Sequence, residues 1–131
     1  MRAIDTNVLV RALVQDDAAQ AGRAQQLLRE HEIFVPVTVM LELEWVLRSR
    51  YAYSSAVTRK AIEMIAALEN VVVDQRDAVL SAAGKMAHGW DFADALHHAL
   101  SVGCDDFVTL DGDLARVAKR VSRVAPAVTR L

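Results

Sequence analysis

The spacing of hydrophobic and polar residues predicts short strands that alternate with longer helices. Compact β-branched runs such as 33–35 and 71–73 are typical of buried strands, whereas apolar residues three or four positions apart between these runs are typical of helices. Strands separated by helices pair in parallel through right-handed crossovers. The pattern therefore predicts an α/β fold with a short parallel sheet.

The predicted elements cover most of the chain. Strands are expected at residues 2–4, 33–35, 71–73, 107–110 and 124–128, and the last should lie at a sheet edge because it contains Pro126. Helices are expected at 6–14, from Asp16 or Asp17 to about 30, at 39–48, from Ser54 or Ser55 to about 68, and at 77–88, 92–102 and 112–121. The expected helix boundaries include caps at Thr38 and Asp91 and glycine ends at Gly89 and Gly103.

Length and composition indicate one globular domain over residues 1–131. The chain is 53% hydrophobic and 24% charged, so it has enough apolar mass for a core and does not resemble a disordered chain. No uninterrupted apolar stretch is long enough to span a membrane, and Asp5 interrupts any signal-peptide apolar region. The single cysteine, Cys104, fits the reducing cytoplasm, where we expect the protein to be.

The net charge of −2 does not by itself favour nucleic-acid binding. The charges are unevenly distributed, however, because residues 114–131 contain five basic side chains and no acid. This segment fits a solvated helix face followed by a tail, and it also fits a surface that contacts phosphates.

Two acids follow predicted strands directly. Asp5 comes after the first strand and Asp111 after the strand at 107–110, and ligands of open parallel sheets bind beyond these carboxyl ends. Asp5 is equally well explained as the cap of the helix that follows it. Asp113 stands next to Leu114 and is the better helix cap, which leaves Asp111 as the site candidate.

Two further pairs of acids stand on predicted helices. Glu42 and Glu44 are two residues apart and cannot face the same way, and the apolar run around Glu42 favours a functional role there, because a buried unpaired carboxylate is costly. Glu44 is expected to reach solvent or an arginine. Asp91 and Asp94 are three residues apart and share a face, with Asp91 suited to capping and Asp94 to a site. His97, three residues beyond Asp94, fits a partly exposed surface histidine or a contact near the acids.

Several carboxylates in one place repel one another and titrate as a coupled set. A divalent cation relieves this repulsion, and an all-oxygen set of ligands selects Mg²⁺ or Mn²⁺ over Zn²⁺. Such an ion can activate water and stabilise charge on a phosphoryl oxygen. If the acids converge, the sequence predicts a metal-dependent phosphoryl chemistry.

The motifs together resemble the PIN-domain nucleases and, within them, the VapC toxins of type II toxin–antitoxin systems. The segments that carry the resemblance are Ile4-Asp5-Thr6-Asn7-Val8-Leu9-Val10-Arg11, Leu41-Glu42-Leu43-Glu44-Trp45-Val46-Leu47, Asp91-Phe92-Ala93-Asp94-Ala95-Leu96-His97 and Thr109-Leu110-Asp111. Their order and spacing match along nearly the whole chain. The family commonly has Thr-Phe-Asp where this chain has Thr109-Leu110-Asp111.

The resemblance implies a three-layer α/β/α sandwich and a pocket formed by Asp5, Glu42, Asp94 and Asp111. It implies a Mg²⁺- or Mn²⁺-dependent endoribonuclease, in which Asp5, Asp94 and Asp111 bind the metal and Glu42 orients the attacking water or binds a second ion. It further implies a homodimer and a cognate antitoxin protein. Supporting hydrogen bonds near the acids are expected from Thr6 or Asn7 and from Thr109. Arg11, Arg48, Arg50 and the C-terminal basic residues are candidates for steering RNA, and Arg48 and Arg50 could instead pair with an acidic segment of the antitoxin.

Two rival functions fit parts of the sequence. Haloacid-dehalogenase-like phosphatases also begin with an aspartate after the first strand, but they need a second one two residues later, where this chain has Asn7. The other rival is a catalytically silent PIN-fold module that only binds a partner. All four candidate acids are present, which favours the enzyme.

Overall fold

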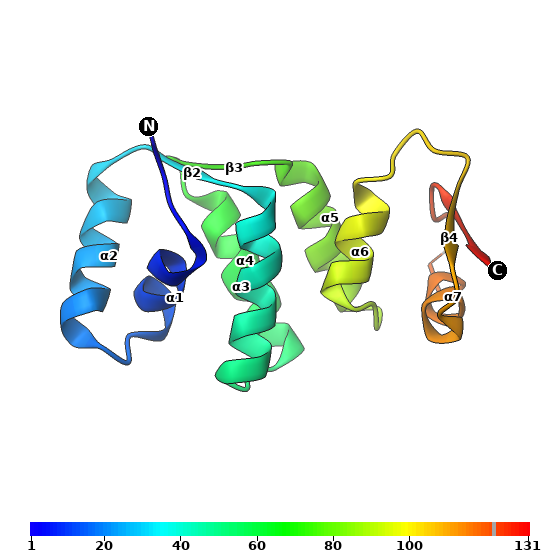
Figure 1. Cartoon of the computed structure of the whole chain (residues 1–131), viewed down its shortest axis with the longest axis horizontal. Coiled ribbons are helices and arrows are strands. Elements are labelled where there is room, and N and C mark those ends of the chain that lie inside the picture. Colours follow the sequence, from blue (N-terminus) through cyan, green and yellow to red (C-terminus); the bar gives the residue numbers. More distant parts are fainter. Residues whose placement is uncertain (122) are drawn as a thin grey trace. The chain divides into compact units, whose positions relative to one another are not determined.

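The computed structural model describes residues 1–121 and 123–131 of the chain. Over these residues it forms seven helices and five strands (Figure 1). In chain order they are β1 (Arg2–Ala3), α1 (Thr6–Val14), α2 (Ala18–Glu30), β2 (Ile33–Val35), α3 (Val37–Arg50), α4 (Ser55–Ala67), β3 (Val71–Val73), α5 (Arg76–Met86), α6 (Phe92–Ala99), β4 (Asp106–Thr109), α7 (Gly112–Ala118) and β5 (Ala127–Arg130). The α/β fold class is confirmed.

The chain divides into two compact units, Met1–Arg76 and Asp77–Leu131, which are described separately. Each unit contains its own small sheet, and every strand pair is parallel, as predicted. The expectation of one sheet is corrected, because β1, β2 and β3 form one sheet and β4 and β5 form another. The expectation of one domain over residues 1–131 stays a prediction.

The first unit places Asp5 at the carboxyl end of β1. The strand order is β1-β2-β3, and Ile33 pairs with Arg2 on one side and with Val71 on the other. Ile33 and Val35 are fully buried, which explains why this short central strand is uniformly apolar. Two of the helices are capped as expected, since Asp17 accepts a hydrogen bond from the Gln20 amide and Ser54 accepts one from the Val57 amide.

Helix α3 differs from its prediction at both ends. It starts at Val37 directly after Pro36, which makes no side-chain cap, so Thr38 lies inside the first turn and the expected Thr38 cap is wrong. The helix also continues to Arg50, two residues beyond the predicted end at 48. Glu42 and Glu44 therefore lie near the middle of a regular helix.

The second unit carries the remaining candidate acids, Asp94 on α6 and Asp111 at the start of α7. Asp91 caps α6 as predicted, and Gly89 and Gly103 take the left-handed conformation, with φ of +88° and +91°. Helix α6 ends at Ala99 rather than at Val102, and α7 ends at Ala118, three residues before the predicted boundary at 121. Strand β5 begins after Pro126, whose nitrogen has no proton to donate to a sheet.

His98 organises the buried core of the second unit. Its side chain is 1% exposed, and its Nδ1 lies 2.8 Å from the Lys85 Nζ while its Nε2 lies 2.7 Å from the Pro126 carbonyl oxygen. The ammonium can only donate, so Nδ1 accepts and the proton stands on Nε2, which donates to Pro126. The rings of Trp90 and Phe107 pack against the imidazole at 5.3 and 5.7 Å between centroids. His98 is therefore a neutral, structural histidine.

Acidification is expected to weaken the fold through His98. Burial lowers the pKa of His98, the Lys85 charge lowers it further, and the hydrogen bond to Pro126 opposes both. The unfolded chain takes up a proton on this histidine near pH 6.5, whereas the folded chain resists it. The contribution of His98 to the free energy of unfolding is therefore fully present above that pH and is lost as the pH drops toward the folded pKa. The loss amounts to about 1.4 kcal/mol for each unit by which the folded pKa lies below the unfolded one.

Urea unfolding at pH 7.5 and at pH 5.0 measures this loss. The decrease between the two pH values should shrink in His98→Gln and persist in His88→Gln, because His88 is exposed. An unchanged decrease in His98→Gln contradicts the assignment of the pH dependence to His98.

Candidate functional site

Asp5 begins α1 as its N-cap. Its backbone is extended, and its Oδ1 accepts a hydrogen bond of 3.3 Å from the Val8 amide. The side chain is nevertheless exposed, so the carboxylate remains accessible to solvent while it caps the helix. Capping and a role in a site are therefore compatible for Asp5.

Thr6 joins the start of α1 to α3. This side chain is 5% exposed, and its Oγ1 donates a short hydrogen bond to Oε1 of Glu42. The expectation that Thr6 or Asn7 supports the acids is met by Thr6, which orients Glu42. Glu42 itself is exposed, so the expectation that it is a buried carboxylate is wrong. Its hydrogen bond to Thr6 nevertheless places it next to the residue that follows Asp5.

Glu44 is the buried acid of α3. Its side chain is 3% exposed, and its two carboxylate oxygens lie 3.3 and 3.2 Å from the Arg48 Nε one turn later. The sequence predicts that Glu44 reaches solvent or an arginine, and it reaches the arginine. The paired charge explains why an acid is tolerated at this apolar position.

Four aspartates of the second unit surround one cavity of about 260 Å³. It is lined by Gly89, Asp91, Asp94, Asp111, Asp113, Leu114, Arg116 and Val117. Asp94 stands in the first turn of α6, and its amide donates to Oδ2 of the Asp91 cap at 3.3 Å. The start of α6 and the start of α7 thus contribute acids to the same cavity.

Asp111, and not Asp113, caps α7. Its Oδ1 accepts hydrogen bonds from the amides of Asp113 at 2.8 Å and Leu114 at 3.2 Å, which corrects the sequence prediction. The Asp111 amide in turn donates to Thr109 Oγ1 at 2.9 Å, so Thr109 provides the supporting hydrogen bond expected of it. Asp113 is exposed and forms an ion pair of 3.0 Å with Arg116.

The aspartates of the cavity influence one another electrostatically. Burial raises the pKa of the Asp94 carboxyl above its usual value, the negative charges of Asp91 and Asp111 raise it further, and His97 opposes the shift. This mutual repulsion is the situation that a bound cation relieves. His97 is exposed and close enough to Asp94 to act on its charge, whereas the neighbouring His98 is buried in the core.

The four predicted site acids fall into two pairs. Asp5 and Glu42 belong to the first unit and both adjoin Thr6, whereas Asp94 and Asp111 belong to the second and line one cavity. Within the part of the chain that the structure describes, no three histidine, cysteine or acidic side chains stand close enough to hold a metal ion as placed. Their all-oxygen chemistry and the raised pKa of Asp94 nevertheless fit a hard divalent cation.

Arg116 also lines the cavity, although the sequence indicated only that it belongs to a basic segment. It reaches the cavity and pairs with Asp113 three residues earlier on the same helix. The spacing of opposite charges at i and i+3 is the signal that could have identified this pair.

Comparison with known proteins gives the family of the chain. No helix within the described residues is long and apolar enough to cross a membrane. A search of curated proteins found no match. The family model of the PIN domain matches residues 3–120, which include all four candidate acids, and the chain therefore belongs to the PIN domain family, whose members are typically nucleases.

Proposed function

We propose that this chain is a Mg²⁺- or Mn²⁺-dependent endoribonuclease and the toxin of a VapBC-type toxin–antitoxin module. The observation that carries the proposal is the cavity lined by Asp94 and Asp111, in a chain of the PIN family. Burial and the negative charges of Asp91 and Asp111 raise the pKa of Asp94 there. PIN nucleases generally use divalent ions, and the carboxylates supply the oxygen ligands that such ions prefer. Asp5 is proposed as the third metal ligand, as the resemblance to VapC toxins implies.

The protein residues have distinct roles in this proposal. A bound ion would stabilise negative charge on the phosphoryl oxygens and lower the pKa of water. The Glu42 carboxylate, held by the Thr6 hydroxyl, orients the water that attacks phosphorus and can accept its proton. The water oxygen then bonds to phosphorus as the bond from phosphorus to the ribose oxygen breaks, and the departing ribose oxygen takes a proton from solvent water.

The toxin role, the cognate antitoxin and the homodimer rest on the resemblance to VapC toxins. If the chain is a toxin, its expression alone should arrest the growth of the host cells. Its expression together with the protein encoded by a short adjacent reading frame should restore growth. Growth arrest that Asp94→Asn fails to relieve would count against RNA cleavage as the toxic activity.

Metal binding is expected to stabilise the folded chain. An ion that binds only the folded state at one hundred times its Kd adds about 2.7 kcal/mol, so Mn²⁺ should raise the Tm in thermal unfolding. Asp5→Asn and Asp111→Asn, one from each unit, should both reduce the rise. Asp105→Asn is the matched control, because Asp105 is exposed and does not line the acidic cavity.

RNA cleavage with and without EDTA completes the test. Cleavage that requires the metal, together with a Tm shift that depends on Asp5 and Asp111, supports the nuclease. A Tm shift without cleavage identifies a metal-binding module, and the absence of both, with retained binding to a partner, identifies the silent PIN-fold alternative.

A further inference from the structure

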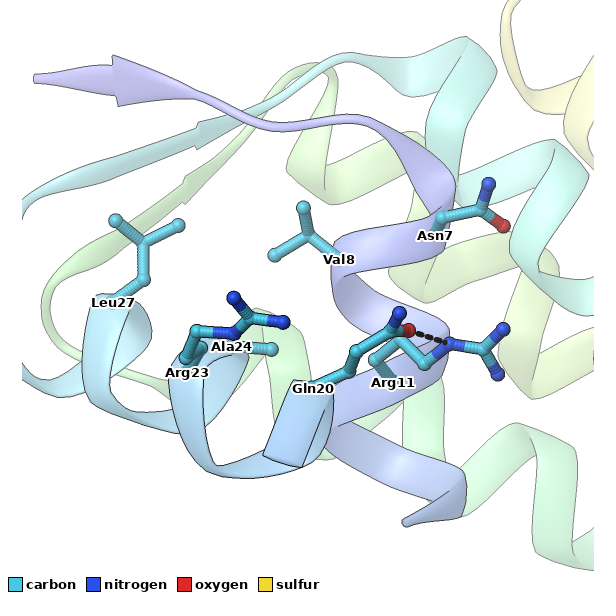
Figure 2. A pocket seen from close by; sticks show the side chains of 7 residues that line it. All are labelled: Asn7, Val8, Arg11, Gln20, Arg23, Ala24 and Leu27. Carbon is cyan, nitrogen blue, oxygen red and sulfur yellow. Dashed lines mark hydrogen bonds between the residues drawn. The ribbon is translucent and has the colours of Figure 1, made fainter. Parts of the chain in front are cut away.

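A second pocket, distinct in character from the acidic cavity, lies in the first unit between α1 and α2. Its volume is about 510 Å³, and it is lined by Asn7, Val8, Arg11, Gln20, Arg23, Ala24 and Leu27 (Figure 2). Two arginines and two amide residues make up the polar part of its lining, and none of the described residues that line it is acidic. The donors and the positive charge suit an anion.

The polar wall is partly held in place before any ligand binds. The Arg11 Nε donates to the Gln20 Oε1 of α2 at 2.6 Å (Figure 2). The Arg11 Nη1 donates to the Asp16 Oδ1 at 3.0 Å, so α2 and the turn that precedes it hold this guanidinium. Because Gln20 uses its oxygen for this bond, its amide protons remain available for a ligand. Prior ordering of such side chains reduces the entropy lost on binding.

Arg23 supplies the positive charge that is not neutralised. It is exposed on α2, its guanidinium extends toward α1, and within residues 1–121 and 123–131 it makes no ion pair (Figure 2). The Arg11 charge, by contrast, is compensated by Asp16. An anionic ligand in this pocket would therefore gain most from Arg23.

The pocket begins close to Asp5 along α1. Asn7 is two residues beyond Asp5 and Arg11 is six, and a rise of 1.5 Å per residue places Arg11 about 9 Å from Asp5 along the helix axis. One strand of RNA with a phosphodiester at Asp5 can bring a neighbouring phosphodiester to the pocket. Helix α1 thus connects Asp5 of the proposed reaction centre to hydrogen-bond donors that can contact a phosphate, all within the first unit.

We infer that the pocket formed by Asn7, Arg11, Gln20 and Arg23 binds a backbone phosphodiester of the RNA beside the one that is cleaved. This inference rests on the proposed ribonuclease function and adds a subsite to it. Contacts to phosphate position a strand without reading its bases, so the pocket fixes where the strand lies and leaves the sequence preference to other residues.

The test compares two arginines of the same helix. Arg23→Gln removes the charge inside the pocket, and Arg29→Gln removes the same charge from the last turn of α2, where Arg29 borders a different, apolar pocket. Binding of a fluorescein-labelled single-stranded RNA of mixed sequence is measured by anisotropy in EDTA, where no cleavage occurs. Both side chains are exposed, so both variants should fold.

Arg23→Gln is expected to weaken RNA binding about fivefold to tenfold and to reduce the slope of log Kd against log salt by about 0.7, as for the loss of one phosphate contact on a single strand. Arg29→Gln should have a clearly smaller effect. Equal effects of the two variants, or no effect of Arg23→Gln while the parent binds RNA, would overturn the phosphate subsite and leave the proposed ribonuclease function standing. If the parent neither binds nor cleaves RNA, the proposed function fails and this subsite fails with it. Stronger competition by polyglutamate than by unlabelled RNA would assign the pocket to an acidic polypeptide instead.

Discussion

Asp94→Asn is expected to cleave RNA at least about 100-fold more slowly than the parent protein, as is typical when one preorganised electrostatic group is removed from a reaction centre. The substitution keeps the size of the side chain and removes its negative charge. That charge lies in a cavity where burial, together with the charges of Asp91 and Asp111, raises the pKa of Asp94, which is why the position is suited to a cation. Single-turnover cleavage of a labelled RNA in saturating Mn²⁺ measures the loss.

Asp105→Asn serves as the control for this prediction, because it removes an exposed acid of the same unit outside the cavity. It should cleave within a few-fold of the parent. Because relief of repulsion among the aspartates stabilises the fold, Asp94→Asn should also melt no lower than the parent in EDTA. Parent-like cleavage by Asp94→Asn would remove this residue from the mechanism.

Arg48→Met is expected to destabilise the first unit by about 3 kcal/mol, because it leaves the Glu44 carboxylate buried without its ion pair. Glu44 is 3% exposed and holds Arg48 through both carboxylate oxygens. Glu44→Leu should cost much less or even stabilise the protein, because it removes the buried charge and fits an apolar setting. Urea unfolding gives both values.

The double variant Glu44→Leu with Arg48→Met distinguishes this cause from any other loss at Arg48. If the buried charge is the cause, the double variant is more stable than Arg48→Met alone, and the coupling is measured by the cycle. Arg48→Lys keeps a charge near Glu44 and should lie between the parent and Arg48→Met. A double variant less stable than either single one contradicts the explanation.

Local signals in the sequence predicted most of the elements. Helix α1 and the strands at 33–35 and 71–73 have the predicted bounds, because caps and short β-branched runs act over a few residues. The ends of α3 and α6 were harder to predict, since a helix can continue through polar residues or stop in a turn without a change in periodicity. The division of the strands into two sheets depends on contacts between residues distant in sequence.

The choice between neighbouring acids was the harder part of the site. The apolar run of α3 correctly indicates that one glutamate is buried, but its periodicity does not show which, and Glu44 rather than Glu42 occupies that place. Likewise, either Asp111 or Asp113 could cap α7, and the Thr109 hydroxyl that fixes the Asp111 amide favours Asp111. The Lys85–His98–Pro126 arrangement gave no sequence signal, because its members are far apart in the chain.

Each of Asp5, Asp91 and Asp111 starts a helix with its own side chain. Replacing one of them by alanine would therefore fray a helix and remove a charge at once, at a cost of about 1 kcal/mol from the lost cap alone. Asparagine caps helices about as well as aspartate and carries no charge. For this chain, an alanine variant could lose activity because its helix frays or because the charge is missing. A series of asparagine variants keeps the caps, so their loss of activity would report the charge alone.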